Sequence, residues 1–269
     1  MWQGVIEVDK KNSHLEIVVI SLPNDCKRRE HLRQQFPRYF QTFHIIDGID
    51  LRAPDSGINV TLPTQCSRLA RKPLTREEIG CAMSHLKALE YAASSKACSV
   101  LILEDDVLGT DESIDAIDAV IQELPKHHFL LCGGQEGLRG ERYLYGRKKG
   151  DNHYLLPGVV LRFVARACAY AVTPSMAVVI QKRQRQCLDR ADHWRMLLLS
   201  ERAIFFTQKL KHPSTPNESH LEKGRSILKQ ENPWRRARAD GLRYTLMTQA
   251  IKIVLPIIAR ALGWTRPQK

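Results

Sequence analysis

The sequence predicts an α/β protein with a mostly parallel central sheet covered by helices. Three observations lead to this fold class: short β-branched and aliphatic runs recur, segments of helical periodicity separate them, and turn-forming or acidic residues follow them directly. At 269 residues, with 43% hydrophobic and 26% charged residues, the chain can bury a sizeable core.

The first elements are a strand, a helix and a second strand. Glu16–Leu22 is typical of a strand buried on both faces. A polar helix is expected over about 27–36, and a second strand over 43–46 with Asp47 at its carboxyl end. Residues 50–72 contain Pro54, Gly57 and Pro63, and we expect a long loop there.

A capping box at Thr75–Glu78 begins the next helix. Its apolar positions recur at helical spacing: Ile79, Ala82, Met83, Leu86 and Leu89. A buried strand is expected at 100–103, and it ends abruptly at Glu104–Asp106. Another helix is expected over about 113–124.

Two more strands are expected, at 129–132 and at 168–172, and Pro174 opens the helix after the second. In such sheets ligands bind beyond the carboxyl ends of the parallel strands. This rule makes the residues after the strands neighbours on one edge: Ser21, Asp47, Glu104–Asp106 and Gly133–Gly134.

The three consecutive carboxylates suggest a divalent cation. They repel one another, and removing them from water is costly unless a cation compensates. Glu104 and Asp106, two positions apart on an extended segment, project to the same side and can share one ion. Mg²⁺ and Mn²⁺ prefer such oxygen ligands and often share them with substrate phosphates. The alternative is a solvated loop that caps the next helix.

The positive charge is concentrated near the end of the sequence. Residues 222–269 hold 11 Lys and Arg but 3 Asp and Glu, and so carry +8 of the net +12. Leucines and isoleucines alternate with these basic residues after Trp234, which suits a basic amphipathic helix at an anionic membrane surface. The alternative is a terminal helix whose apolar side packs on residues 1–221, the expected catalytic domain.

The remaining bulk features favour a cytoplasmic protein. No uncharged apolar stretch of about 18 residues is present, and the first residues lack the apolar segment of a secretory signal. Seven scattered cysteines without a C-x-x-C pair suit reduced, individually buried thiols. We therefore expect a cytoplasmic protein, peripheral at the inner face of the cytoplasmic membrane through its basic tail.

Three separated blocks together resemble glycosyltransferase family 25, the lipopolysaccharide-type glycosyltransferases. The blocks are Val19–Leu22 with Arg28 and Arg29, Leu74–His85, and Leu101–Val107. Weaker matches follow at Ala169–Pro174, at Ala191–Trp194 and around Pro213 and Ser226. Each block is weak singly, but their ordered combination is specific.

The resemblance implies a GT-A-like nucleotide-binding fold, a UDP-sugar donor and a metal site of the D-x-D type. It also implies transfer of a hexose, with galactose from UDP-galactose as the first candidate, to a glycan or glycolipid acceptor. Because the motif here is Glu104-Asp105-Asp106, we assign the Mn²⁺ or Mg²⁺ ion first to Asp106 and then to Glu104. Asp105 then holds the ribose or contacts the metal through water.

The matched blocks also suggest roles for single residues. The donor-site candidates are Ser21, Leu22, Arg28, Arg29, Asp47, Glu78, Ser84, His85, Glu104 and Asp105. If transfer inverts the sugar, a base must take the acceptor proton, and Asp192 is the candidate. Trp194 can offer the acceptor sugar a stacking surface.

Structural roles remain open for several candidates. Arg28 and Arg29 can equally form a charged helix face, Asp47 can cap a turn, and Asp192 can be an exposed helical residue. His85 can be a buried histidine with hydrogen-bonded nitrogens. A zinc site made by Glu78, Cys81 and His85 is disfavoured, because it has one histidine and widely spaced ligands.

Two other functions compete with the transferase. A metal-dependent phosphodiesterase or nucleotidyltransferase can use the same acidic edge, but it leaves the three blocks unexplained. A nucleic-acid binder can use the positive charge. The charge is clustered in an aliphatic tail without a recognisable nucleic-acid module, so we expect no nucleic-acid partner.

Overall fold

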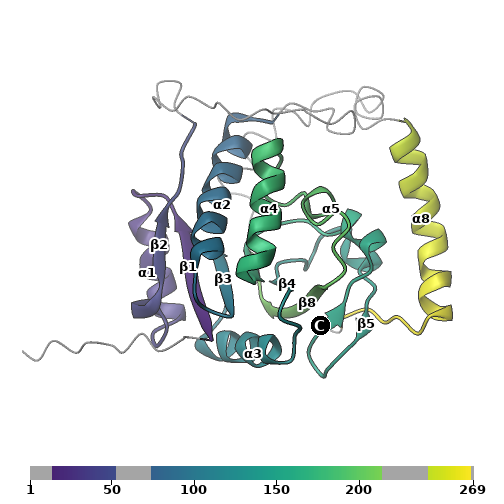
Figure 1. Ribbon diagram of the computed structural model, residues 1–269, viewed down its shortest axis with the longest axis horizontal. Helices are drawn as coiled ribbons and strands as arrows, with labels where there is room; N and C mark the ends of the chain where they lie inside the picture. Colours follow the sequence, from purple (N-terminus) through teal and green to yellow (C-terminus); the bar gives the residue numbers. More distant parts are fainter. Residues whose placement is uncertain (1–13, 53–73, 214–241, 268–269) are drawn as a thin grey trace, which may run out of the picture.

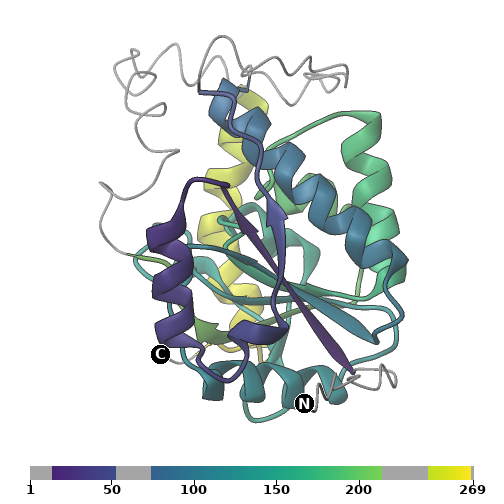
Figure 2. The same ribbon diagram turned by 90° about the vertical axis from the view of Figure 1, so that its left-hand side faces the viewer.

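The computed structural model describes residues 14–52, 74–213 and 242–267. Within these residues, eight strands form one sheet in the order β2-β1-β3-β7-β4-β8-β6-β5. Helices lie on both faces of the sheet (Figure 1, and Figure 2 after rotation by 90°). The predicted α/β class is confirmed.

The strands of the amino-terminal part run parallel to one another. They are β1 (Leu15–Ser21), β2 (His44–Asp47) and β3 (Ser99–Glu104). Ser21 of β1 pairs with Asp47 of β2, and Ile20 pairs with Glu104 of β3. The carboxyl ends of these strands therefore meet at one edge of the sheet, as the strand-end rule predicts.

The other half of the sheet is mixed. Its strands are β4 (Phe129–Gly133), β5 (Arg147–Lys148), β6 (Tyr154–Leu155), β7 (Ala169–Val172) and β8 (Ile204–Leu210). β4 and β8 are parallel, whereas β7 lies between β3 and β4 and runs against both. Three of the seven strand pairs in the described part of the chain are parallel, so the predicted mostly parallel sheet is wrong.

The path of the chain explains the direction of β7. Two neighbouring strands that run parallel begin at the same end of the sheet. The chain must therefore cross over from the carboxyl end of the first strand to the amino end of the second. Here the segment after β4 comes back to the edge it left, where the backbone N–H of Glu104 donates to the carbonyl of Cys168 (2.9 Å). A chain that re-enters at the same edge must run antiparallel.

The helices cover the sheet in two layers. They are α1 (Cys26–Gln35), α2 (Arg76–Ser94), α3 (Asp111–Gln122), α4 (Pro174–Gln186), α5 (Trp194–Leu197) and α8 (Leu242–Ala261). Short 3₁₀ turns occupy Phe40–Thr42, Glu141–Tyr143 and Gly158–Arg162. Ile102 of β3 belongs to the core cluster with α2 and α4, and the adjacent Leu101 and Leu103 belong to the cluster with α1 and α3. Each such buried aliphatic side chain contributes about 1.5–3 kcal/mol.

Two reciprocal hydrogen bonds form the N-terminal cap of α2. The Thr75 hydroxyl accepts from the backbone N–H of Glu78 (3.2 Å), and the Glu78 carboxylate accepts from the backbone N–H of Thr75 (3.1 Å). The Ser84 hydroxyl accepts from the backbone N–H of Ile49 (2.8 Å). A side chain at Gly80 would meet the Ile49 carbonyl at 2.5 Å, so the segment after β2 lies directly on α2.

The carboxyl-terminal helix α8 packs on the same core. Leu255 and Ala259 are fully buried, and Leu255 belongs to the cluster that contains residues of β1 and α2. A two-bond bridge joins Gly146 to Thr265 (2.9 Å each) beyond the end of the helix. The expected domain boundary at residue 222 and most of the basic cluster lie outside the described residues, as does nearly all of the expected 50–72 loop.

None of the helices in the described ranges combines the length and the hydropathy needed to cross a bilayer.

The cysteines depart from the expected reduced and buried set. Cys132 and Cys168 are buried free thiols, and burial raises the pKa of both. Cys26 and Cys98 are exposed. Cys187 is in a disulfide bond, so the expectation of seven reduced thiols is wrong, and cysteine usage no longer supports a reducing compartment.

Candidate active site

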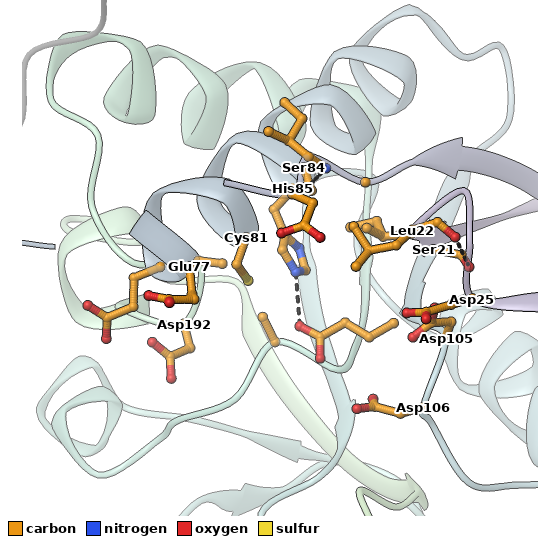
Figure 3. A pocket seen from close by; sticks show the side chains of 18 of the residues that line it. Ser21, Leu22, Asp25, Glu77, Cys81, Ser84, His85, Asp105, Asp106 and Asp192 are labelled. Atoms are coloured by element: carbon orange, nitrogen blue, oxygen red, sulfur yellow. Dashed lines mark hydrogen bonds and ion pairs between the residues drawn. The ribbon is translucent and has the colours of Figure 1, made fainter. Parts of the chain in front are cut away.

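A cavity of about 330 Å³ opens at the edge where the parallel strands end. The ends of β1 and β3, the first turns of α2, the segments before β7 and α5, and His212 after β8 all line it. Figure 3 shows that Asp105 and Asp106 lie on one side of this cavity, with Glu77 and Asp192 on the other. The cavity therefore has two acidic ends.

Arg28 holds the acidic end formed after β3. Its Nη1 donates to Oδ1 of Asp105 (2.8 Å) and lies 3.5 Å from Oδ2 of Asp106. Burial raises the pKa of Asp105 despite this partner. Burial acts to lower the pKa of Arg28, but the hydrogen bond and charge of Asp105 outweigh it and raise that pKa.

Asp106 is the carboxylate with the least compensation. Its Oδ1 is buried and makes no hydrogen bond within the described part of the protein. Burial, followed by the charge of Glu104, raises the pKa of Asp106 to about 6. A buried acceptor without a donor is costly, and a cation at this oxygen would supply the missing partner.

Glu104 is oriented by a histidine and a tyrosine behind it. Nε2 of His85 lies 3.1 Å from Oε1 of Glu104, and Nδ1 of His85 lies 3.0 Å from the hydroxyl of Tyr170. Because the carboxylate accepts, Nε2–H donates to Glu104 and the Tyr170 hydroxyl donates to Nδ1. Burial acts to raise the pKa of Glu104, but the hydrogen bond and charge of His85 outweigh it and lower that pKa.

A third metal-ligand candidate, His212, completes this end. Ligand atoms of Glu104, Asp106 and His212 lie within 4.8 Å of one another. Nδ1 of His212 is 2.8 Å from the carbonyl of Pro213, which can only accept, so Nδ1 carries the proton and Nε2 of the neutral ring is free to bind a metal. Two carboxylates suit Mn²⁺ or Mg²⁺, and the added imidazole nitrogen favours the transition metal Mn²⁺ over Mg²⁺, which prefers oxygen ligands.

A second group, Cys81, His85 and Glu104, also lies within 4.8 Å. It contains two members of the disfavoured zinc set, with Glu104 in place of Glu78. Both ring nitrogens of His85 already have partners in Glu104 and Tyr170, so this group fits a metal less well.

The opposite end of the cavity holds Asp192. Its Oδ2 accepts from the backbone N–H of Arg166 (3.2 Å), a residue in the left-handed conformation with φ 61°. The Arg166 guanidinium donates to the carbonyls of Gly134 (2.9 Å) and Glu136 (3.3 Å), which ties this loop to the end of β4. Asp192 is thus held in place, apart from Asp105 and Asp106 (Figure 3).

The structure brings most of the sequence-predicted site residues to one cavity. Those that line it are Ser21, Leu22, Arg28, Glu78, Ser84, His85, Glu104, Asp105, Asp106 and Asp192. It does not bring Arg29 or Asp47 there: the Arg29 guanidinium donates to the carbonyls of Leu22 and Pro23, and the Asp47 side chain is exposed.

One prediction about the acceptor side is wrong. Trp194 is buried, with 1% of its surface exposed, and it packs against the rings of Phe129 and Tyr170. Its indole N–H donates to the Arg166 carbonyl (3.0 Å). Trp194 therefore supports the loop that holds Asp192 and offers no surface to a sugar.

Sequence reasoning missed His212, Glu77 and Arg166. The run at 204–210 is rich in aromatic and aliphatic residues, and it would have predicted a strand with His212 just beyond its carboxyl end. Glu77 lies inside the recognised capping box. Arg166 carries no local signal, since its position depends on the path of the whole loop.

The sequence profile of glycosyltransferase family 25, described as an LPS biosynthesis protein, matches residues 14–154. This match covers more than half of the chain. The chain belongs to glycosyltransferase family 25. Of the residues at the acidic end, Arg28, His85 and the three carboxylates lie within the family 25 match, and His212 lies beyond it.

Two curated proteins are similar over shorter stretches. The procollagen lysyl hydroxylase and glycosyltransferase of Acanthamoeba polyphaga mimivirus is 28% identical over 138 residues, which is 48% of this chain and 14% of the viral protein. A protein of Haemophilus influenzae named as a glycosyltransferase is 32% identical over 92 residues, 33% of this chain and 31% of that protein. The family 25 chain thus aligns with less than a third of either relative.

A solved structure of the galactosyltransferase LgtC in complex with donor and acceptor sugar analogues is 14% identical and covers 84% of this chain and 100% of that chain, with a TM-score of 0.38. The assignment to family 25 rests on the sequence match.

Proposed function

We propose that this family 25 glycosyltransferase transfers a hexose, galactose from UDP-galactose in the first instance, to a saccharide of a lipopolysaccharide, lipooligosaccharide or other lipid-linked surface glycan. The reaction requires a divalent metal and inverts the sugar, in a GT-A-like nucleotide-binding fold. The observation that carries the proposal is the convergence of Glu104, Asp106, His212 and Arg28 in one cavity.

Glu104, Asp106 and His212 are the residues that would hold Mn²⁺ or Mg²⁺. When bound, the ion supplies charge neutralisation for a departing diphosphate. The unpartnered Oδ1 of Asp106 and the available Nε2 of His212 support this assignment. His85 fixes the orientation of the Glu104 carboxylate by the hydrogen bond to its Oε1, which would prepare that carboxylate to bind the ion.

Arg28 and Asp105 bind and orient the donor. The Arg28 guanidinium lines the cavity beside Asp105 and Asp106, and its positive charge suits the phosphate oxygens of a donor. Asp105, held by Arg28, offers its carboxylate to the ribose. Ser21 and Leu22 at the end of β1 line the same side of the cavity.

Asp192 acts as the base for the acceptor. The acceptor oxygen forms a bond to the anomeric carbon as the bond from that carbon to the diphosphate breaks, and Asp192 takes the hydroxyl proton while UDP leaves. The N–H of Arg166 fixes Asp192 in position, and its place across the cavity from Asp105 and Asp106 supports attack on the opposite face of the sugar.

The competing function is a metal-dependent phosphodiesterase or nucleotidyltransferase. It uses the same acidic end but cleaves at phosphorus, and it has no need for Asp192. Family 25 membership counts against it.

A panel of nucleotide-sugars tests the donor, the metal and the bond cleaved. We expect UDP-galactose to raise the melting temperature only when Mn²⁺ is present, because a ligand that binds the folded state stabilises it. Asp106→Asn should remove that shift, whereas Asp151→Asn, which changes a fully exposed carboxylate, should keep it.

Product analysis then separates the two functions. Free galactose or a galactoside, with UDP, supports the transferase. Release of UMP with galactose 1-phosphate supports cleavage at phosphorus and overturns the proposal, as does stabilisation by UDP-galactose that EDTA leaves unchanged.

A further inference from the structure

Helix α8 exposes an unusual amount of apolar surface. Ten large hydrophobic side chains are exposed in the described part of the protein, and seven of them lie between residues 246 and 262. They are Leu246, Met247, Ile253, Val254, Ile257, Ile258 and Leu262, with exposed fractions from 43% to 71%. This group, which we call the α8 outer face, exceeds the scatter of single exposed residues normal for a monomer.

The opposite side of the helix packs against the rest of the domain. Ile251, Leu255 and Ala259 follow one another at four-residue spacing and contact the core, with Leu255 and Ala259 buried. The Arg162 guanidinium donates to the Thr248 hydroxyl (3.4 Å) on the same side. The helix is therefore packed on the domain through this side, and the α8 outer face stays exposed to solvent.

Spacing shows that the outer face is continuous. Leu246, Ile253 and Ile257 are separated by seven and four positions, and so share one stripe of the helix. Met247, Val254 and Ile258 repeat the same spacing one residue later and form the adjacent stripe. Two neighbouring stripes make a broad apolar band along α8.

The charged residues of the segment that contains α8 have one sign. Residues 241–269 contain five Lys and Arg and no Asp or Glu. Arg260 and Arg266 are exposed beside the band, and Lys252 is half-buried with its ammonium group 5.7 Å from the centre of the Tyr143 ring. An apolar band on a helix segment with basic and no acidic residues suits an anionic bilayer, where the aliphatic side chains enter the acyl region and basic groups meet phosphate.

From these observations we infer that the α8 outer face docks the protein on the surface of an anionic phospholipid membrane. The first turn of α8 and the first turn of α2, which lines the cavity, lie at the same end of the molecule in both views (Figures 1 and 2).

The test is co-sedimentation of the full chain with vesicles of phosphatidylcholine alone or with 30% phosphatidylglycerol, a fraction of about one third chosen to resemble anionic membranes. We expect binding to the mixed vesicles. Ile253→Ser with Ile257→Ser should lower the partition coefficient at least roughly ten-fold. The matched control is Val178→Ser with Leu199→Ser, which removes two exposed apolar side chains elsewhere and should bind as the unmodified protein does.

A charge variant tests the second half of the argument. Arg260→Glu should weaken binding to the mixed vesicles and leave the small binding to phosphatidylcholine unchanged, with less difference at high salt. Circular dichroism and melting temperature of each variant confirm that exposed substitutions leave the fold intact.

Three results would overturn the inference. One is unchanged sedimentation of the Ile253 and Ile257 variant. Another is equal loss with the Val178 and Leu199 control. The third is a stable dimer in solution that the α8 variant, and not the control, converts to monomer, because the outer face would then be an interface between copies. None of these measurements depends on sugar transfer, so they leave the proposed function untouched.

Discussion

Residues 14–154, which match the family, contribute Arg28, His85 and the three carboxylates to the cavity, whereas Asp192 and His212 come from the part after that match. The first group could be predicted from nearby sequence patterns, because a strand, a capping box and an acidic run mark the positions of its residues. The second group reaches the cavity through the fold. The proposed mechanism therefore depends in part on Asp192, which lies in a weak family block, and on His212, which no short motif marks. Variants of these two residues test whether the site extends beyond the matched region.

The largest effect is expected at Asp192. Asp192→Asn keeps the size of the side chain and removes the base, so kcat should fall by on the order of 10²–10⁴, with UDP-galactose binding retained. The measurement is steady-state transfer together with donor binding by calorimetry. Glu77→Gln, at the same end of the cavity, is the control and should reduce kcat far less. An equally large loss in both variants would show that kcat depends on both carboxylates and would leave Asp192 without a distinct role as the base.

The next effect is expected at His212. His212→Gln removes the imidazole near Glu104 and Asp106, and the apparent affinity for Mn²⁺ should fall by at least roughly 10–100-fold. Raising the Mn²⁺ concentration should restore part of the rate. If the variant is active at the same Mn²⁺ concentration as the unmodified protein, His212 is not a metal ligand. The metal site would then lie within residues 14–154, the part that matches the family.

A smaller effect is expected at the residues behind Glu104. Tyr170→Phe leaves Nδ1 of His85 without its donor and should weaken apparent Mn²⁺ binding by roughly ten-fold, as is typical for partners of metal ligands. A purely structural role would lower the melting temperature and leave the Mn²⁺ requirement alone. His85→Asn should shift the same Mn²⁺ requirement further, since it removes the bond to Glu104 itself.

The smallest effect is expected at the start of α2. Thr75→Ala removes the hydroxyl that accepts from Glu78 N–H, and the free energy of unfolding should fall by about 1 kcal/mol. Thermal unfolding should show a decrease of about 2–4 °C. Thr75→Ser keeps the hydroxyl and serves as the control; a decrease of the same size there would point to lost packing of the methyl group instead of the cap.

The first strands and the edge they share could be predicted because local rules determine them. β1, β3 and β4 are continuous apolar runs, which only a strand buried on both faces explains, and the residues after them must meet if the strands are parallel. Glu104, Asp105 and Asp106 follow from this alone. The capping box likewise placed the start of α2 at its observed position.

The direction of β7 could not be read from its residues. A buried strand has the same composition in either direction, and only the return of the preceding segment to the edge near Cys168 decides it. Trp194 failed for a related reason: its sequence position beside Asp192 suggested the cavity, but α5 turns the indole toward Phe129 and Tyr170. Its pairing with the Arg166 carbonyl arises from distant parts of the chain.

The terminal helix shows that two sequence interpretations can hold together. Packing on the domain and contact with a membrane were alternatives, since one apolar stripe can serve either purpose. The structure uses one stripe, with Leu255 and Ala259, for packing, and two further stripes stay exposed. The width of the apolar band that stays exposed distinguishes a helix that only packs on the domain from one that also offers a second apolar face. This width depends on how much of the helix the neighbouring elements cover.

The antiparallel insertion of β7 has a consequence for how relatives can diverge. The chain leaves β4 and re-enters β7 at the same end of the sheet. The segment between these two strands therefore forms the side of the cavity that carries Arg166, opposite the carboxylates. The part of this segment between β6 and β7 contains no strand, so a change in its length leaves the strand pairs and the carboxylate side of the cavity in place. We expect acceptor preference to vary among relatives through this segment, while the side that carries the three carboxylates stays constant.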